Sequence, residues 1–553
     1  MVTTAPNQYP AAIEPEPRSP LGEQPLHQYL SQWANETPEN SVINYYGNEI
    51  SYRELDDAVD RFAQFLTSRG YGRGDTLLLF LQNSPQYYIG YYAAHRLGLR
   101  ASPCSPMAKG HRVSYQLDDG DVDVVLAQDT YSDVVESVRG ESSLEDVVYT
   151  RLETYLPDDP TPDLHDDMTD AIETDRQPTG DSTRYLSSVL DETNRIEQTP
   201  ETAMDDVALL QYTSGTTGMP KGCKHTHRTI LYKAASNATA MGYNDATRFL
   251  EVMPIFHVAG KLFGVDTPMV SGGTTVLLTR YSPDALLEAI DAHRPTMSWL
   301  TTPMVRSVLG ESDVEQYALT SLERTPTTSF GQALTEELCQ KWHEVTEGEM
   351  FEAAYGLSET HTMDTFTRGL GVVEEGFVGR PSHGVDIVVR DWDTHDEVPL
   401  GETGEISVKS PSVMKGYLNK PEETRESFYD DYVLTGDVGR MTEEGFLYFL
   451  GRRKNMIKTS GYSVSPAEVE QILKEHDAID NAAVVGRTHD AKGEEVVSFV
   501  TSPDETLSSD AIVDWAKDAM AAYKRPRAVF VVEELPTTDV GKLDRQRLEE
   551  MVD

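Results

Sequence analysis

A run of small, hydroxylic and glycine residues surrounds a single lysine in the segment QYTSGTTGMPKG, residues 211–222. Glycines and small side chains let backbone N–H groups approach a polyphosphate closely, and a concave row of amides suits anions. The hydroxyl groups add donors, and Lys221 adds a positive charge. The segment is predicted to bind phosphate groups, with an ordinary polar loop as the alternative. The residues expected to line it are Thr213, Ser214, Gly215, Thr216, Thr217, Gly218 and Lys221.

The residues next to the lysine separate this segment from the Walker A loop, G-x-x-x-x-G-K-[ST]. Pro220 rather than glycine precedes Lys221, and Gly222 rather than serine or threonine follows it. No residue therefore stands at the usual Walker position for magnesium. A P-loop NTPase that couples hydrolysis to motion is disfavoured, and cleavage of ATP to ADP rather than to AMP would revive it.

The chain has 553 residues, of which 92 are acidic and 47 basic, so its formal net charge is -45. This length favours two or more domains. A surface of this charge repels nucleic acid and anionic membranes, so an acidic substrate must enter a locally basic site. The charge is spread along the chain and resembles that of a salt-adapted cytoplasmic protein; solubility alone is the alternative, but it requires far less charge.

The three cysteines, Cys104, Cys223 and Cys339, are far apart and match no metal-binding spacing. They cannot all pair, which favours a reducing compartment. The first residues, MVTTAPNQYPAAIEPEP, lack the charged and apolar regions of a signal peptide. No apolar run reaches membrane-spanning length. A cytoplasmic protein without integral membrane association is expected.

Alternating helix and strand patterns indicate layered α/β structure. Residues 51–70 predict a helix with a Ser51–Glu54 capping box, and strand and helix patterns then alternate. The acidic, aperiodic residues 157–206 are expected to form a solvated, mobile insertion, with a regulatory or partner-binding segment as the alternative. Short strands and turns over 380–450 predict a small β-rich subdomain.

The pattern changes again beyond Gly451, where strands and helices follow one another in a compact α/β unit. The expected fold is therefore α/β, with a large N-terminal domain of layered subdomains over residues 1–451. A small mobile C-terminal α/β domain is expected over residues 452–553.

Several motifs recur in a fixed order along the chain, and together they resemble the adenylate-forming superfamily. That superfamily includes acyl-CoA synthetases, firefly luciferase and peptide-synthetase adenylation domains. The resemblance covers about residue 25 to 548, and on it the chain is identified as a member. The motifs are YTSGTTGMPKG (212–222), MPIFHVAG (253–260), FEAAYGLSET (351–360), GETGEI (401–406), LTGD (434–437), GRRKNMIKTSGYSVSPAEVE (451–470) and LPTTDVGKLDR (535–545).

The resemblance implies an enzyme that joins a carboxylate to AMP, releases pyrophosphate and passes the acyl group to a thiol. Two anions must then approach each other, so positive charge has to be aimed at them. Lys542 matches the lysine that bridges carboxylate and α-phosphate. Glu359 matches the ligand of Mg²⁺ and Thr213 the loop hydroxyl associated with the metal. The alternatives are a surface lysine and a solvated glutamate.

The resemblance also assigns the nucleotide contacts. Asp437 and Arg452 match the pair on the ribose hydroxyls, and Tyr355 matches the ring that stacks on adenine. The segment SFGQAL (329–334) stands at the adenine loop, where Gln332 and Ala333 depart from the Gly-Gly-Ala-Pro-Leu-like pattern of relatives. The remaining residues expected on the nucleotide are Gly331, Gly356 and Ser358.

Members of this family swing the C-terminal domain between half-reactions, and Lys454 falls at the hinge position. Lys458 and Gly461 are then expected to face the site during thioester formation, so Lys458 and Lys542 serve different steps. A merely solvated loop lysine is the alternative for Lys454.

The acyl pocket is expected around His257, Trp299, Gly331 and Gly356. His257 matches the gate beside the entering carboxylate, with a packed histidine as the alternative. Acetyl-specific relatives place tryptophan at the position of Gly356, so glycine is expected to leave the pocket open. This favours a medium- or long-chain fatty acid or an aromatic acid over acetate.

Free coenzyme A is the expected acceptor, because no carrier domain follows Lys542. An acid–CoA ligase with ATP, Mg²⁺ and coenzyme A is therefore predicted, acting on a medium- or long-chain fatty acid. An aryl-CoA ligase and an acyl-AMP ligase serving a separate carrier protein are the alternatives, and a non-catalytic binding protein is disfavoured by the intact motif residues. No nucleic-acid partner is expected, and homodimer formation stays open.

Overall fold

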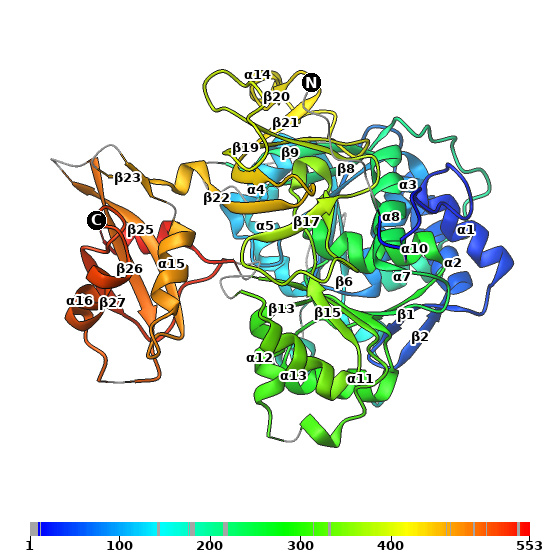
Figure 1. Ribbon diagram of the computed structural model, residues 1–553. Coiled ribbons are helices and arrows are strands. Elements are labelled where there is room, and N and C mark those ends of the chain that lie inside the picture. The colour runs from blue at the N-terminus through cyan, green and yellow to red at the C-terminus, as the bar shows by residue number, and fades with distance from the viewer. Residues whose placement is uncertain are drawn as a thin grey trace.

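The computed structural model describes residues 9–11, 13–140, 144–174, 176, 183–213, 219–312, 314–329, 333–459, 462–464, 466–489, 493–504, 506–538 and 542–552. The chain forms mixed α/β structure built on four sheets, called sheets A to D here. Sheets A to C belong to a large N-terminal part, and sheet D belongs to a smaller C-terminal unit, as expected. Figure 1 shows the C-terminal unit, coloured orange to red, standing to one side of the rest of the chain.

Sheets A and B are the α/β layers that the alternating pattern predicted, and both are mainly parallel. Sheet A is ordered β13-β14-β12-β10-β11-β1-β2, with β15 beside β14, and sheet B is ordered β7-β6-β5-β3-β4-β8-β9. The strands of sheet A are β1 (Ser41–Tyr45), β2 (Asn48–Ser51), β10 (Arg248–Glu251), β11 (Thr274–Leu277), β12 (Met297–Ser298), β13 (Leu300–Thr301), β14 (Arg324–Thr328) and β15 (Glu349–Glu352). Those of sheet B are β3 (Thr76–Phe80), β4 (Arg100–Pro103), β5 (Val122–Gln128), β6 (Asp146–Thr150), β7 (Thr183–Tyr185), β8 (Val207–Tyr212) and β9 (Gly222–Thr226).

Helix α2 (Tyr52–Ser68) begins at the cap that the sequence predicts. The Ser51 hydroxyl accepts the Glu54 N–H at 3.2 Å, and the Glu54 carboxylate accepts the Ser51 N–H at 2.8 Å, so the expected capping box is confirmed. The helices are α1 (Leu26–Glu36), α2 (Tyr52–Ser68), α3 (Pro85–Leu97), α4 (Gly110–Gly120), α5 (Ser132–Arg139), α6 (Asp166–Glu173), α7 (Leu186–Glu192), α8 (His227–Met241), α9 (Val258–Gly260), α10 (Thr267–Ser271), α11 (Pro283–His293), α12 (Thr302–Gly310) and α13 (Glu336–Thr346).

Helices α3 and α8 are buried along almost their whole length. A helix that is buried on every side must be covered by other elements all round. Gly90 of α3 packs against Leu79 and Leu126 of sheet B. The hydroxyl of Tyr88 donates to the carbonyl of Gly264 at 2.9 Å, in the segment that leads toward sheet A. These buried helices tie the layers into one core.

Sheet C is the β-rich subdomain that the sequence predicted, and its strands are antiparallel. Its order is β16-β17-β22-β21-β19-β18, with β20 beside β21. Its elements are β16 (Thr365–Phe366), β17 (Phe377–Pro381), β18 (Asp386–Arg390), β19 (Thr403–Lys409), α14 (Pro421–Glu426), β20 (Phe428–Tyr429), β21 (Tyr432–Met441) and β22 (Leu447–Arg452).

Sheet D has the order β24-β23-β26-β25, with β27 parallel to β26. It has its own apolar core, in which Val469 of α15 and Ile512 of α16 pack against the sheet. On its other face Leu548 of α17 is fully buried. The elements are β23 (Ile457–Thr459), β24 (Tyr462–Val464), α15 (Pro466–Lys474), β25 (Asn481–His489), β26 (Gly493–Thr501), α16 (Ser509–Ala519), β27 (Ala528–Val531) and α17 (Arg545–Glu550).

Residues 157–206, expected to be a solvated, mobile insertion, are largely exposed in their described part but contain regular secondary structure. Helices α6 and α7 flank strand β7, which extends sheet B beside β6. Met168 and Leu186 are each only 1% exposed and pack into the large apolar core. Sparse apolar residues that pack into a neighbouring core leave no periodic signal in the sequence.

An ion network also fixes this segment. The guanidinium of Arg195 lies 2.6 Å from the carboxylate of Asp56 and 2.7 Å from that of Asp60, both on α2. Arg96 of α3 pairs with the same two carboxylates from the buried side. Each of the two carboxylates is thus paired with both arginines, so no charge of the network is left unpaired. These ion pairs hold the polar segment against α2. Among the described residues, no helix has the length and apolar character that crossing a membrane requires.

Candidate active site

The phosphate-loop candidate connects two antiparallel strands, β8 and β9. The Thr213 N–H donates to the carbonyl of Lys221 at 3.0 Å, and the Lys221 N–H donates to the Thr213 hydroxyl at 3.1 Å. These bonds close the base of the loop. A Walker A loop instead leads from a strand into a helix, so the geometry agrees with the exclusion made from the sequence. Ser214, Gly215, Thr216, Thr217 and Gly218 lie outside the described residues.

Glu359 lies in the turn Ser358–Thr360 and faces a tyrosine that sequence reasoning missed. The hydroxyl of Tyr417 donates to the Glu359 carboxylate at 2.7 Å. The Lys221 ammonium lies 4.1 Å from the centre of the same ring. Burial and then the charge of Glu359 raise the pKa of Tyr417 above its ordinary range, so this phenol stays a donor. Tyr417 thus links the loop lysine to the expected metal ligand.

Asp437 and Arg452 are register partners on β21 and β22, as their predicted shared role requires. The Arg452 Nε lies 2.8 Å from Asp437 Oδ1, and the Tyr355 hydroxyl donates to Asp437 Oδ2 at 2.7 Å. Burial raises the pKa of Asp437, while Arg452 and then Tyr355 lower it. The structure therefore brings together the three residues expected on the adenosine, and it holds the carboxylate in one orientation.

Lys542 comes from the C-terminal unit and lies among N-terminal site residues. The Thr538 N–H donates to the Lys542 carbonyl at 2.6 Å. Although Lys542 keeps contact with solvent, the surrounding protein and then Arg452 lower its pKa, while Asp437 raises it. Burial and then the charge of Lys542 lower the pKa of His257 to about 3. The ammonium thus acts on both the expected ribose carboxylate and the expected acyl gate.

His257 caps α9, where its Nδ1 accepts the Ala259 N–H at 3.4 Å. Because its pKa is about 3, the imidazole is neutral in the physiological range. The nearby Trp299 is buried, stacks on Phe263 at 5.2 Å between ring centres, and donates its Nε1–H to the Thr328 hydroxyl at 2.8 Å. A neutral histidine and an apolar aromatic wall suit the acyl side of such a site.

Gly356 has a packing role that sequence reasoning missed. A Cβ atom at this position would come within 2.4 Å of the Met363 nitrogen and 2.6 Å of the Thr362 backbone. The glycine is therefore required for close backbone packing. Whether the glycine also leaves an acyl pocket open stays a prediction, but a side chain at this position would first meet the backbone of residues 362–363.

The backbone that Gly356 contacts is unusual, because His361, Thr362 and Met363 all have left-handed φ angles of 63°, 58° and 50°. A β-branched residue in this region is strained. Residues after Glu359 therefore need support from their surroundings. The sequence carries no signal for this run, because none of the three residues is a glycine or an asparagine.

Buried charges provide that support. The Lys233 ammonium lies 2.9 Å from the Asp364 carboxylate and donates to the Met363 carbonyl at 3.3 Å. His361 lies 3.3 Å from the Lys261 ammonium, which is paired with Asp266 in a π-helical turn. Both ion pairs were missed by sequence reasoning, because their partners are identified only by the fold.

The other predicted residues are placed as follows. Lys454 lies in the turn Arg453–Asn455 between sheets C and D, and burial and then Arg452 lower its pKa. Lys458 belongs to β23. The carbonyl of Ser358 accepts a hydrogen bond from His225 Nε2 at 2.8 Å when that nitrogen carries the proton. Ala333 is half-buried. Gly331, Gln332 and Gly461 lie outside the described residues.

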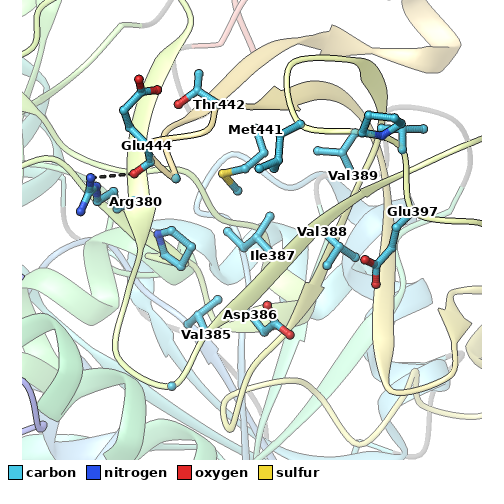
Figure 2. Close-up of a pocket in the computed structure, with 16 residues that line it drawn as sticks. Arg380, Val385, Asp386, Ile387, Val388, Val389, Glu397, Met441, Thr442 and Glu444 are labelled. Atoms are coloured by element: carbon cyan, nitrogen blue, oxygen red, sulfur yellow. Dashed lines mark hydrogen bonds between the residues drawn. The ribbon is translucent and has the colours of Figure 1, made fainter. Parts of the chain in front are cut away.

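A pocket of about 410 Å³ lies in sheet C, between β18 and residues 441–445. Figure 2 shows Ile387 and Met441 near its middle and the Arg380 guanidinium donating to the Glu444 carbonyl, at 2.6 Å. None of the predicted site residues lines it. The candidate active site is therefore the group around Asp437, Glu359 and Lys542, away from this pocket.

Comparisons with known proteins match almost the whole chain. The family described as AMP-binding enzyme matches residues 30–418, and the AMP-binding enzyme C-terminal domain matches residues 468–542. A long-chain-fatty-acid–CoA ligase of Bacillus subtilis is 32% identical, over 98% of this chain and 96% of its own. A 2-succinylbenzoate–CoA ligase of the same organism is 30% identical, over 96% and 98%. The structure of o-succinylbenzoate CoA synthetase from Bacillus subtilis, in complex with its acyl-adenylate intermediate, has a TM-score of 0.78 at 27% identity and covers 95% of this chain and 98% of that one.

Proposed function

The chain belongs to the AMP-binding enzyme family, and from this premise we propose that it is an ATP-dependent acid–CoA ligase. It forms acyl-AMP and pyrophosphate from a carboxylic acid and ATP, and then transfers the acyl group to coenzyme A with release of AMP. The match of both family models over most of the chain carries the proposal, and the effect of the Lys542 charge on the pKa of His257, after that of burial, supports it.

Adenylation joins two anions, the carboxylate of the acid and the α-phosphate of ATP. A preorganised cation between them stabilises the charge that develops on the phosphate in the transition state. After burial, the charge of Lys542 lowers the pKa of the predicted acyl gate, His257, and it opposes the increase that burial causes in the pKa of the predicted ribose carboxylate, Asp437. This supports giving this lysine the role of that cation. Neutral His257 adds no second positive charge and can border the carboxylate without being protonated.

The carboxylate of Glu359 is the kind of oxygen ligand that the predicted magnesium ion requires. Magnesium is commonly held by one or two carboxylates together with phosphate oxygens and water. Among the described residues there is no cluster of three or more His, Cys, Asp or Glu side chains able to hold a metal. Glu359, with Thr213 near the loop, would therefore hold an ion that is bound mainly through the nucleotide, and that ion would neutralise phosphate charge.

The two half-reactions are proposed to use different lysines. Lys542 serves adenylation, and Lys458 with Gly461 serves thioester formation after the C-terminal unit has turned about Lys454. The turn that contains Lys454 lies between sheets C and D, where a hinge must be placed.

The proposed substrate is a medium- or long-chain fatty acid. This is supported by the relative named as a long-chain-fatty-acid–CoA ligase, which is 32% identical. An aromatic acid is the second candidate, because a relative named as a 2-succinylbenzoate–CoA ligase is 30% identical.

The test is acid-dependent release of AMP, measured with ATP, magnesium and coenzyme A across fatty, aryl and short acids. Release that depends on a fatty acid and on coenzyme A supports the proposal, and preference for 2-succinylbenzoate or coumarate shifts it to the aryl class. Adenylate formation without transfer to coenzyme A indicates a ligase that serves a carrier protein. If no acid elicits AMP, the proposed function is wrong.

A further inference from the structure

A polar pocket of about 380 Å³ lies beside Tyr417, outside the group of residues assigned to the reaction. Tyr417 lines the pocket and also carries the Lys221 ammonium over its ring at 4.1 Å. The pocket therefore adjoins the phosphate end of the candidate active site. Its lining residues are Lys224, Lys415, Tyr417, Asn419, Lys420, Pro421 and Thr424.

The charge of this pocket is opposite to that of the molecule. The chain has 92 acidic residues against 47 basic ones, yet three lysines and no carboxylate are among the residues that line the pocket. A basic site on a strongly acidic surface attracts anions locally, while the rest of the surface repels them. The pocket is thus a place where a polyanion can be concentrated.

Two acidic residues that contact the pocket lysines are already engaged, and Glu422 and Glu423, which follow Pro421 in the chain, are not among the lining residues. Asp119 pairs with Lys420 at 3.4 Å and accepts the Tyr212 hydroxyl at 2.8 Å. The Asp205 carbonyl accepts the Lys415 ammonium at 2.7 Å, and the Asp205 carboxylate pairs with Arg228 at 2.9 Å. Because a lysine ammonium has three donors, Lys415 and Lys420 retain capacity for further acceptors.

Backbone pairing fixes two of the lysines next to each other. The Lys224 N–H donates to the Gly416 carbonyl at 3.0 Å, and the Lys415 N–H donates to the Lys224 carbonyl at 2.8 Å. Two like charges held close together repel each other. Their placement on adjacent backbones is explained if an anion binds between them. Lys224 also follows Lys221 by three residues, so the start of β9 joins the phosphate loop directly to the pocket.

We propose that this pocket binds the phosphoryl groups of a soluble polyanion. Lysine is a compact point charge that contacts phosphate oxygens without a fixed geometry, which suits a ligand that enters and leaves. The source of the phosphoryl groups rests on the proposed function. It is either pyrophosphate leaving the adjacent site or the phosphate-bearing nucleotide part of coenzyme A.

The test is direct binding by isothermal titration to the full chain at fixed ionic strength. An ATP analogue that cannot be cleaved between the α- and β-phosphates first fills the nucleotide site, and its own binding is measured. Sodium pyrophosphate and adenosine 3′,5′-bisphosphate are then titrated separately.

The pocket variant carries Lys224→Gln, Lys415→Gln and Lys420→Gln. The matched control carries Lys341→Gln, Lys409→Gln and Lys517→Gln, which change the net charge equally at exposed lysines elsewhere.

The pocket variant is expected to bind the anion at least about tenfold more weakly than the control variant, because charge-assisted hydrogen bonds are lost. Weakening for pyrophosphate alone identifies the leaving product, weakening for the bisphosphate alone identifies coenzyme A, and weakening for both supports a shared site. Equal affinities of the two variants for both anions overturn the proposal. Lys224→Glu alone, with thermal melting as the folding check, repeats the comparison if the triple variant is poorly folded. Failure of the ATP analogue to bind would instead count against the proposed function.

Discussion

The ammonium of Lys233 lies 2.9 Å from the carboxylate of Asp364, and both side chains are buried at 1% and 0% exposure. Lys233 also donates to the carbonyl of Met363, the last of the left-handed residues that follow Glu359. Breaking one partner of a buried pair leaves an uncompensated charge and costs about 3–5 kcal/mol. The pair therefore holds the strained backbone that positions the expected metal ligand.

Lys233→Met is expected to lower the free energy of unfolding by about 3–5 kcal/mol and to raise the KM for magnesium-ATP. The double variant with Asp364→Leu removes both charges, so stability should largely recover while the KM stays high. Denaturant unfolding and steady-state kinetics measure the two effects. A double variant that is stable and has an unchanged KM would show that the pair does not position Glu359.

Tyr417 offers a matched pair of substitutions at the phosphate end of the site. Tyr417→Phe removes the hydroxyl that donates to Glu359 and keeps the ring beneath Lys221, whereas Tyr417→Leu removes both. A hydrogen bond to a partly exposed carboxylate contributes about 1 kcal/mol, so the phenylalanine variant should raise the KM for magnesium-ATP roughly fivefold. The leucine variant should raise it further. Equal KM values for the wild type and both variants would contradict the role given to this ring.

The sequence predicted features that depend on local chemistry, and the structure bears out the Ser51–Glu54 capping box and the difference from a Walker loop. Features that depend on distant partners had no sequence signal. Lys233 and Asp364 are separated by 131 residues, and nothing near either one indicates the other. Likewise, nothing in the sequence indicated that Gly356 packs closely against the backbone at 362–363.

Glu352 gives the fold a pH dependence. Burial raises the pKa of its carboxyl to about 7, and hydrogen bonds from Ser329 lower it in part. The folded state therefore binds a proton that the unfolded state, with the ordinary value of 4.5, has lost. This contribution to stability is complete below about pH 4.5 and is lost as the pH rises through about 7. Glu352→Gln should flatten that slope in denaturation curves measured across this range, and an unchanged slope would exclude Glu352 as its source.

Salt should stabilise the protein and raise its activity. The net charge of -45 causes self-repulsion in the compact state, and dissolved ions screen exposed charges over a shorter distance as salt increases. Thermal melting and turnover are compared at low and molar KCl, with sucrose of matched osmolality as a control for general exclusion effects. Equal melting temperatures at both salt concentrations would contradict salt adaptation.

Lys542 and Lys458 are expected to separate the two half-reactions. Removing one preorganised donor typically costs about 10²–10³ in rate. Lys542→Ala should therefore abolish most acid-dependent pyrophosphate release, because this ammonium is the one that acts on His257 and Asp437. It should still convert chemically made acyl-adenylate and coenzyme A to thioester at near-normal rate, since the proposed turn about Lys454 carries it away from the site. Lys458→Ala should show the reverse behaviour.

Lys517→Ala, at an exposed position of the same unit, controls for loss of a positive charge. If both lysine variants lose both half-reactions equally, the two residues do not act in separate steps, and the proposed alternation of the C-terminal unit is wrong.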